Sequence, residues 1–166
     1  VPIKLISQHF IGPTLGQESI NKSLVAGIIG ITVVAIYMGG YYGILGLVAD
    51  GALVIYTLLV LAIFKTGLFI LPPVTLTLAG IAGFILSIGM AVDANILIFE
   101  RMREEERAGR PKDLTIELGF SRAFPSIRDS NVSTIITSLV LYYFGTGPVK
   151  GFALVLAIGV LVSMFS

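Results

Sequence analysis

The chain of 166 residues contains no cysteine, a single histidine and few charged residues. The lack of cysteine excludes disulfides, thiol nucleophiles and thiolate metal sites. With His9 as the only histidine, a two-histidine metal site or a histidine relay cannot be built within this chain. Charged residues make up 13% of the chain, about half the share expected of a soluble domain. The net charge of +1 gives no basic excess for binding nucleic acid.

Hydrophobic residues, in contrast, account for 55% of the chain, and the mean hydropathy is +0.96. A soluble domain of this length has too little interior to bury so much apolar surface. The composition therefore excludes an ordinary soluble enzyme. It predicts an all-α membrane protein, built as a polytopic bundle of helices.

Five apolar runs approach the length of roughly 20 residues that a membrane-spanning helix needs. We predict spans at about 23–38, 43–64, 75–100, 130–145 and 149–166, so that residues 23–166 form a transmembrane domain. Most links between these spans are short and contain glycine or proline. Short links make neighbouring helices antiparallel, which predicts a compact bundle.

One link is longer and charged, because residues 101–128 hold seven of the eleven lysine and arginine residues. The positive-inside rule places this connector in the cytoplasm and the amino terminus outside. We expect the third span to continue as an exposed helix as far as a stop at Gly109 and Pro111. A second helix, capped by Asp113, is then expected to lie along the membrane interface. Most of the segment is otherwise typical of a solvated connector.

Residues 1–22 differ from the predicted spans. Val1–Ile6 contains β-branched residues, and the next stretch of chain is interrupted by Gly12, Pro13 and Gly16. We expect the last strand and the linker of a domain outside the membrane. A lone strand is not stable, so its partners would belong to a longer protein of which this chain is a piece.

Asp93 is the strongest candidate for a functional residue, because a charge inside the membrane is costly and points to function. It precedes Phe99 by six residues, which places it about 9 Å inside the span at about 1.5 Å per residue. Its helix is rich in small residues such as Gly83 and Gly89, which allow another helix to approach closely. We therefore expect Asp93 to face a packed interior.

A carboxyl group in such a place can load and release a proton as its surroundings alternate between dry and wet, which suits a proton-driven conformational cycle. The alternative is a permanently neutral or paired aspartate that holds helices together. No basic residue lies in the middle of any predicted span. A cationic partner for Asp93 would therefore have to come from another chain or from the missing part, which points to a larger assembly.

Four further polar residues could support this site. Asp50, in the second span, is a candidate partner, a second proton site or a group that reaches the interface. Asp129 is expected to cap the fourth span together with Ser130. Asn95 and Asn131 follow Asp93 and Asp129 at the same spacing, and these two pairs are placed so that they can meet across one helix interface.

The run from Gly89 to Glu105, GMAVDANILIFERMREE, resembles the signature of the SecD family of protein-export membrane subunits. The resemblance continues through 129–134 (DSNVST) and 145–153 (GTGPVKGFA) and back over 12–16 (GPTLG). It covers essentially the whole chain. This family is part of the resistance-nodulation-division superfamily.

The resemblance implies that the chain is half of a pseudo-symmetric SecDF transmembrane domain, with residues 1–22 as the remnant of a periplasmic domain. It implies an accessory subunit of the bacterial cytoplasmic membrane that uses the proton motive force to promote preprotein export. The aspartate of the family's Val-Asp-Ala-Asn motif is its proton-relay carboxylate and matches Asp93. The family's basic relay groups lie in the SecF half, in agreement with the missing cation.

The partners expected from the resemblance are SecF, as a separate chain or a fused half, the SecYEG translocon, a preprotein, the lipid bilayer and protons. Neither nucleic acid nor a cofactor is expected.

Two other functions stay open: an exporter of lipid or drug from the same superfamily, and a passive scaffold of the translocon. An intramembrane protease is disfavoured because no histidine or lysine lies deep in a span to activate a serine, and we expect no enzymatic activity.

Overall fold

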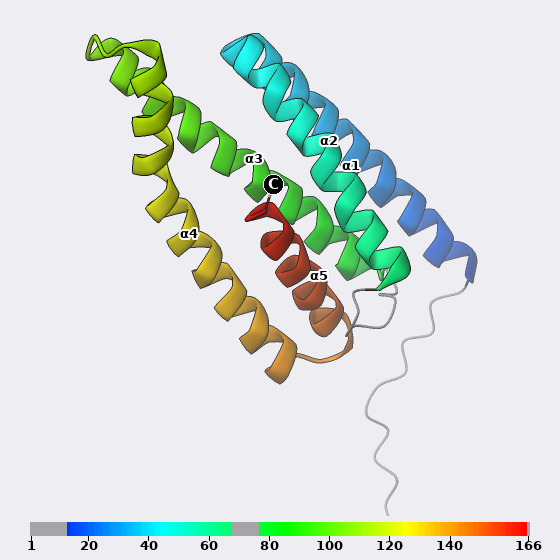
Figure 1. The fold of residues 1–166 in the computed structure, drawn as a ribbon. Coiled ribbons are helices and arrows are strands. Elements are labelled where there is room, and N and C mark those ends of the chain that lie inside the picture. The colour runs from blue at the N-terminus through cyan, green and yellow to red at the C-terminus, as the bar shows by residue number, and fades with distance from the viewer. Residues whose placement is uncertain (1–12, 68–76, 166) are drawn as a thin grey trace, which may run out of the picture.

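The computed structural model describes residues 13–67 and 77–165, and within these ranges the chain forms helices and no strand (Figure 1). The helices are α1 (Pro13–Tyr42), α2 (Ile44–Thr66), α3 (Leu78–Arg107), α4 (Lys112–Phe144) and α5 (Gly147–Ser163). The predicted all-α bundle with five helices is thus confirmed. The strand predicted near the amino terminus lies outside the described residues.

Two helices begin earlier than the sequence predicted. Residues 13–22, expected to be part of a linker, belong to α1, which runs without a break to Tyr42. The helix expected to start at Asp113 is present, but it is not separate from the predicted fourth span, because Lys112–Phe144 is one continuous helix that passes through Pro125. Asp113 lies in the first turn of that helix, and its N-terminus has no side-chain cap.

The end of α3 was predicted correctly. The helix continues to Arg107, and Gly109 follows with φ of 77°, in the left-handed region that favours glycine. The N–H of Gly109 donates to the carbonyl of Glu106 at 3.0 Å, and the N–H of Arg110 donates to the carbonyl of Glu105 at 3.3 Å. These two bonds close a Schellman motif, which satisfies carbonyls that the helix end leaves free.

Among the residues that the structure describes, three helical segments are long and apolar enough to cross a membrane: Gly16–Tyr42, Ile44–Thr66 and Leu78–Arg107. α5 is apolar but has 17 residues. The outer faces of these helices carry large apolar side chains that a soluble protein would bury, among them Ile36 at 71% and Ile44 at 81% exposure. Helices satisfy their own backbone hydrogen bonds, so such faces suit lipid, and the chain is a helical membrane protein.

The helices pack in two groups. α1 packs mainly on α2, joined by a one-residue turn at Gly43, whose φ is 59°. α3, α4 and α5 pack mainly on one another, and Figure 1 shows α5 beside α3 with its C-terminal end near the middle of that helix. Glycines allow the closest approaches: a Cβ at Gly46 would overlap the carbonyl of Met38, and one at Gly159 would overlap Ser87.

The two groups meet along one face of α2, and α1 also contacts α3 directly. That face is formed by buried side chains at helical spacing: Ala49, Leu53, Tyr56, Val60 and Phe64. A single hydroxyl adds a polar contact at this seam, because Tyr56 Oη donates to Ser87 Oγ of α3 at 2.9 Å and to the carbonyl of Gly159 of α5 at 3.1 Å. One buried proton donor therefore joins three helices.

Candidate functional site

Asp93 lies on an open face of α3 within this chain. Ala82, Leu86, Gly89 and Asp93 recur at helical spacing and are all exposed, and a Cβ added at Gly89 would meet no atom within 4 Å. The prediction that Asp93 faces a packed interior is therefore wrong for the described residues. Gly83 does serve close packing, because a Cβ there would lie 2.8 Å from the carbonyl oxygen of Phe152 in α5.

A groove of about 110 Å³ runs beside Asp93 between α3 and α4. Its α3 side is formed by Met90, Asp93, Ala94 and Leu97, and its α4 side by Ser126, Ile127, Ser130 and Asn131. Asn131 is buried, with 7% exposure. Of the two Asp-x-Asn pairs, Asp93 of the first and Asn131 of the second line this same groove.

The other members of the two pairs point elsewhere. Asn95 lines a different cavity, of about 120 Å³, together with Tyr56 and Arg128. Asp129 is exposed in the middle of α4 and accepts a hydrogen bond from Arg128 Nε at 3.0 Å. The expectation that Asp129 caps a helix is wrong, because α4 began 17 residues earlier at Lys112.

Asp50 is not brought to the groove of Asp93. It is partly buried and lines an apolar depression between α1 and α2, beside Ile31, Ala35 and Thr57. In the described part of the chain no ion pair involves Asp50 or Asp93, and no lysine or arginine lines the groove. Over the same residues there is no cluster of three or more His, Cys, Asp or Glu side chains that could hold a metal ion.

The sequence did not identify Ser126 and Ser130 as part of this site. They are four residues apart on α4, next to the groove, and both supply hydroxyl groups opposite Asp93. The expected boundary at residue 130 hid this relation, because a helix assumed to start there leaves Ser126 in a connector. Because Ser126 and Ser130 are themselves four residues apart, a helix continued back past residue 130 would have placed both on one face.

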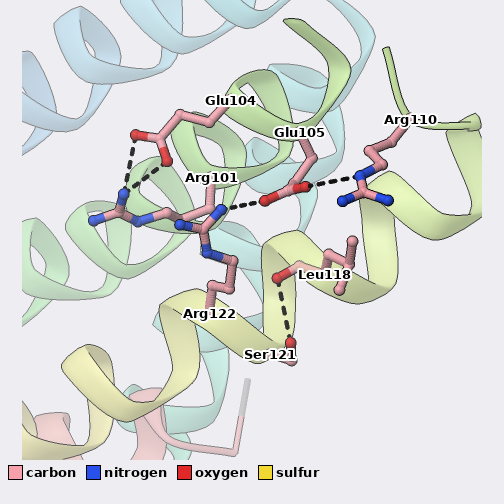
Figure 2. A network of polar contacts seen from close by, with 7 residues as sticks. All are labelled: Arg101, Glu104, Glu105, Arg110, Leu118, Ser121 and Arg122. Atoms are coloured by element: carbon pink, nitrogen blue, oxygen red, sulfur yellow. Dashed lines mark hydrogen bonds and ion pairs between the residues drawn. The ribbon is translucent and has the colours of Figure 1, made fainter. Parts of the chain in front are cut away.

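The end of the bundle where α3 passes to α4 holds a second polar cluster, which we call the charged end (Figure 2). Glu105 of α3 is buried, with 6% exposure. Its carboxylate accepts a close hydrogen bond from Arg122 of α4 and lies 3.9 Å from Arg110 Nε. The segment expected to be mostly a solvated connector is a helical hairpin in which most side chains are exposed, as expected, and four residues are buried: Glu105, Thr115, Gly119 and Ala123.

Arg103 connects α3 to the turn between α1 and α2. Its guanidinium donates to the carbonyl of Tyr41 at 2.8 Å and lies 4.6 Å from the ring centre of Tyr41 and 4.7 Å from that of Tyr42. Tyr42 Oη donates to Glu100 at 3.0 Å. A cation stacked on two rings, with a carbonyl as acceptor, fixes the end of α1 beside α3.

We expect Arg122→Ala to destabilise the protein more than Arg101→Ala. Without Arg122, the buried carboxylate of Glu105 keeps only Arg110, 3.9 Å away, and an unsatisfied buried group costs about 1–3 kcal/mol. Arg101 pairs with Glu104 on the surface, where a lost pair costs about 0–1 kcal/mol. Thermal unfolding of the full-length protein in detergent measures both, and equal melting temperatures would contradict the expectation.

Comparisons with known proteins agree with this architecture. Residues 2–166 match the family described as "Protein export membrane protein SecD/SecF, C-terminal". The protein translocase subunit SecD of Synechocystis sp. is 58% identical over 165 residues, which are 99% of this chain and 34% of that protein. SecD of Thermobaculum terrenum is 54% identical over 170 residues, covering 100% of this chain and 32% of its own.

Solved structures agree as well. SecDF of Thermus thermophilus, described as a translocon-associated membrane protein, superposes with a TM-score of 0.86 at 44% identity, over 93% of this chain and 21% of that chain. SecDF in a super-membrane-facing form gives a TM-score of 0.80 at 42% identity, over 93% and 20%. The chain spans about a third of the length of the curated relatives it matches. It belongs to the SecD/SecF C-terminal family of protein export membrane proteins.

Proposed function

We propose that this chain is the transmembrane part of an accessory subunit of the Sec preprotein translocase, which uses the proton motive force to promote protein export across the bacterial cytoplasmic membrane. Family membership supports the role in export. The relatives SecD of Synechocystis sp. and SecD of Thermobaculum terrenum are protein translocase subunits. In this proposal the subunit is a transport motor and not an enzyme.

The observation that carries the proton-driven mechanism is the place of Asp93. It is the only charged residue of α3 between Leu78 and Phe99. It borders a groove whose other side chains are apolar or neutral polar groups. A charged carboxylate there needs water or a cation, whereas the protonated form tolerates an apolar contact. Loading and release of one proton would therefore change which helix packing is favoured.

The open face around Asp93 supports a partner in the membrane. The small residues Ala82 and Gly89 leave room beside Asp93 for close approach of another helix. We propose that SecF, as a separate chain or a fused half, covers this face and supplies the basic relay groups. SecYEG, the exported preprotein and the lipid bilayer are the other proposed partners, with no nucleic acid and no cofactor.

The proposed orientation puts the charged end in the cytoplasm. Six arginines lie within residues 101–128, which include that end, at positions 101, 103, 107, 110, 122 and 128. Positive charge is retained on the cytoplasmic side of membrane proteins. The start of α1 and the link between α4 and α5 would then face the outside.

Proton flux separates a motor from a passive scaffold. The full-length protein is reconstituted with its partner half in vesicles, and proton entry is followed after a membrane potential and a pH gradient are imposed. We expect Asp93→Asn to reduce the flux to the level of protein-free vesicles, because an amide cannot carry the proton. Asp129→Asn, an exposed aspartate outside the groove, is the matched control and should keep the wild-type flux. Equal proton flux in the wild type and in Asp93→Asn would contradict the proton-driven motor and favour a passive scaffold.

A further inference from the structure

We propose that α4 is a hinged helix. Its membrane half (126–144) pivots at Pro125 against a charged half (112–124) that is fixed to α3, and this pivot opens and closes the groove at Asp93. The inference rests on the proposed function, in which the charge of Asp93 changes during the cycle. It adds the moving element and the fixed anchor of that cycle.

The pivot is Pro125, which lies inside α4. Proline has no N–H to donate to the carbonyl four residues earlier, here that of Ser121, and its ring crowds that carbonyl. Sharp bends in helices occur mostly at such positions. Figure 1 shows that the first turns of α4 and its remaining turns run in different directions, with the bend in the yellow part of the ribbon.

The charged half of α4 is anchored to α3 by two contacts. Glu105 of α3 is buried against Arg122, which extends from α4 as Figure 2 shows. One turn earlier, Gly119 packs so closely on α3 that a Cβ there would overlap the side chain of Met102 and lie 2.9 Å from its backbone nitrogen. An ion pair and a backbone approach that excludes even a methyl group leave this half little freedom to move.

The membrane half supplies one wall of the groove. Ser126, Ile127, Ser130 and Asn131 follow Pro125 directly, so any rotation at Pro125 moves them relative to Asp93. No charged side chain other than Asp93 lines the groove among the described residues of α3 and α4. A charged carboxylate favours a wider, hydrated groove, and a neutral one favours closure. A change at Asp93 can therefore shift the population between two positions of the same helix.

Ser138 gives a second, independent reason to expect another position of the membrane half. Its side chain is 1% exposed, and its Oγ has no hydrogen-bond partner in the part of the chain that the structure describes. Buried hydroxyl groups are nearly always satisfied. If the membrane half moves, the Ser138 hydroxyl can gain a hydrogen bond to another group or to water. That hydrogen bond lowers the free-energy difference between the two positions of the helix.

The test measures the swing directly. Spin labels are attached at Leu78→Cys and Tyr143→Cys, both exposed positions, in the full-length protein; this chain has no cysteine of its own, and any cysteine elsewhere in the full-length protein is first replaced by serine. Tyr143 lies roughly 27 Å from Pro125 at about 1.5 Å per residue. A change of about 10° in a proline kink therefore moves it by roughly 5 Å. Electron paramagnetic resonance gives the distance between the labels.

We expect Asp93→Asn, which holds the site neutral, to shift the distance between the labels by up to about 5 Å. Pro125→Ala restores the N–H and should remove most of this shift. Pro148→Ala is the matched control: Pro148 lies in the first turn of α5, where proline breaks no hydrogen bond, so the shift should persist. A full shift in Pro125→Ala, or no shift in any background, would overturn the hinge.

The anchor is tested by a second pair of variants, which also covers the case that Pro125→Ala does not fold. Glu105→Gln weakens the contact with Arg122 and should broaden the distribution of distances, whereas Glu104→Gln alters only an exposed pair with Arg101 and should not. Equal distributions in these two variants would overturn the anchor. Proton flux remains a separate readout: if Asp93→Asn keeps full flux yet shifts the distance, the proposed function fails and the hinge stands.

Discussion

Preprotein export by the Asp93→Asn variant is expected to fall to the level seen in the absence of a proton gradient. The asparagine keeps the size of the side chain and its place in the groove with Ser130 and Asn131, but it cannot bind or release a proton. The cycle would then remain in one packing arrangement. The measurement is translocation of a preprotein into vesicles that contain the translocase and the full-length protein, with and without an imposed gradient.

Another aspartate serves as the control for this result. Asp129→Asn changes an exposed residue that is bonded to Arg128. We expect Asp129→Asn to export normally. If Asp93→Asn, present at the normal amount, exported as well as the wild type, Asp93 would be a structural residue and the proton-driven mechanism would be wrong.

Gly46→Ala is expected to have the largest effect on folding. The added methyl group would overlap the backbone carbonyl of Met38 and lie 2.9 Å from the backbone nitrogen of Gly39, so the clash involves the main chain of α1. Neither atom can rotate away as a side chain can. Overpacking typically costs about 1–3 kcal/mol, and separation of α1 from α2 would add to this. The amount of folded, monodisperse protein after detergent extraction and its melting temperature measure the effect.

Gly51→Ala is the matched control on the same helix. Gly51 is exposed, and a Cβ there would meet no atom within 4 Å. Alanine is a better helix former than glycine by about 1 kcal/mol, so this variant should be as stable as the wild type or more so. If both glycine variants melted at the same temperature, the close approach of α1 and α2 at Gly46 would not matter for stability.

Local patterns predicted most of the fold. Runs of apolar residues indicated the helices, and Gly109 with Pro111 marked the end of α3 about two turns beyond the apolar part. Helix boundaries were less accurate where polar residues and proline occur inside a helix. α4 passes through Pro125, Asp129 and Ser130, which the sequence suggested as a connector and a cap. Packing on α3 and α5 overrode those local preferences.

Long-range contacts were not predictable in the same way. Glu105 and Arg122 are 17 residues apart, and nothing in either neighbourhood indicates that they meet. Likewise, the spacing of Asp-x-Asn could not decide which residue of each pair faces the groove. The rotation of α4 about its axis decides this, and that rotation is set by contacts such as Gly119 with Met102.

By itself the sequence determined that this protein is a helical membrane protein and that Asp93 is its exceptional charge, because hydropathy and the cost of burying a charge act residue by residue. Only the tertiary structure decided which surroundings Asp93 has. It leaves the face with Leu86 and Gly89 open, and it brings Asn131 to the groove. The physical reason is that the exposure of a helix face depends on where neighbouring helices pack, and close packing between distant segments fixes that position.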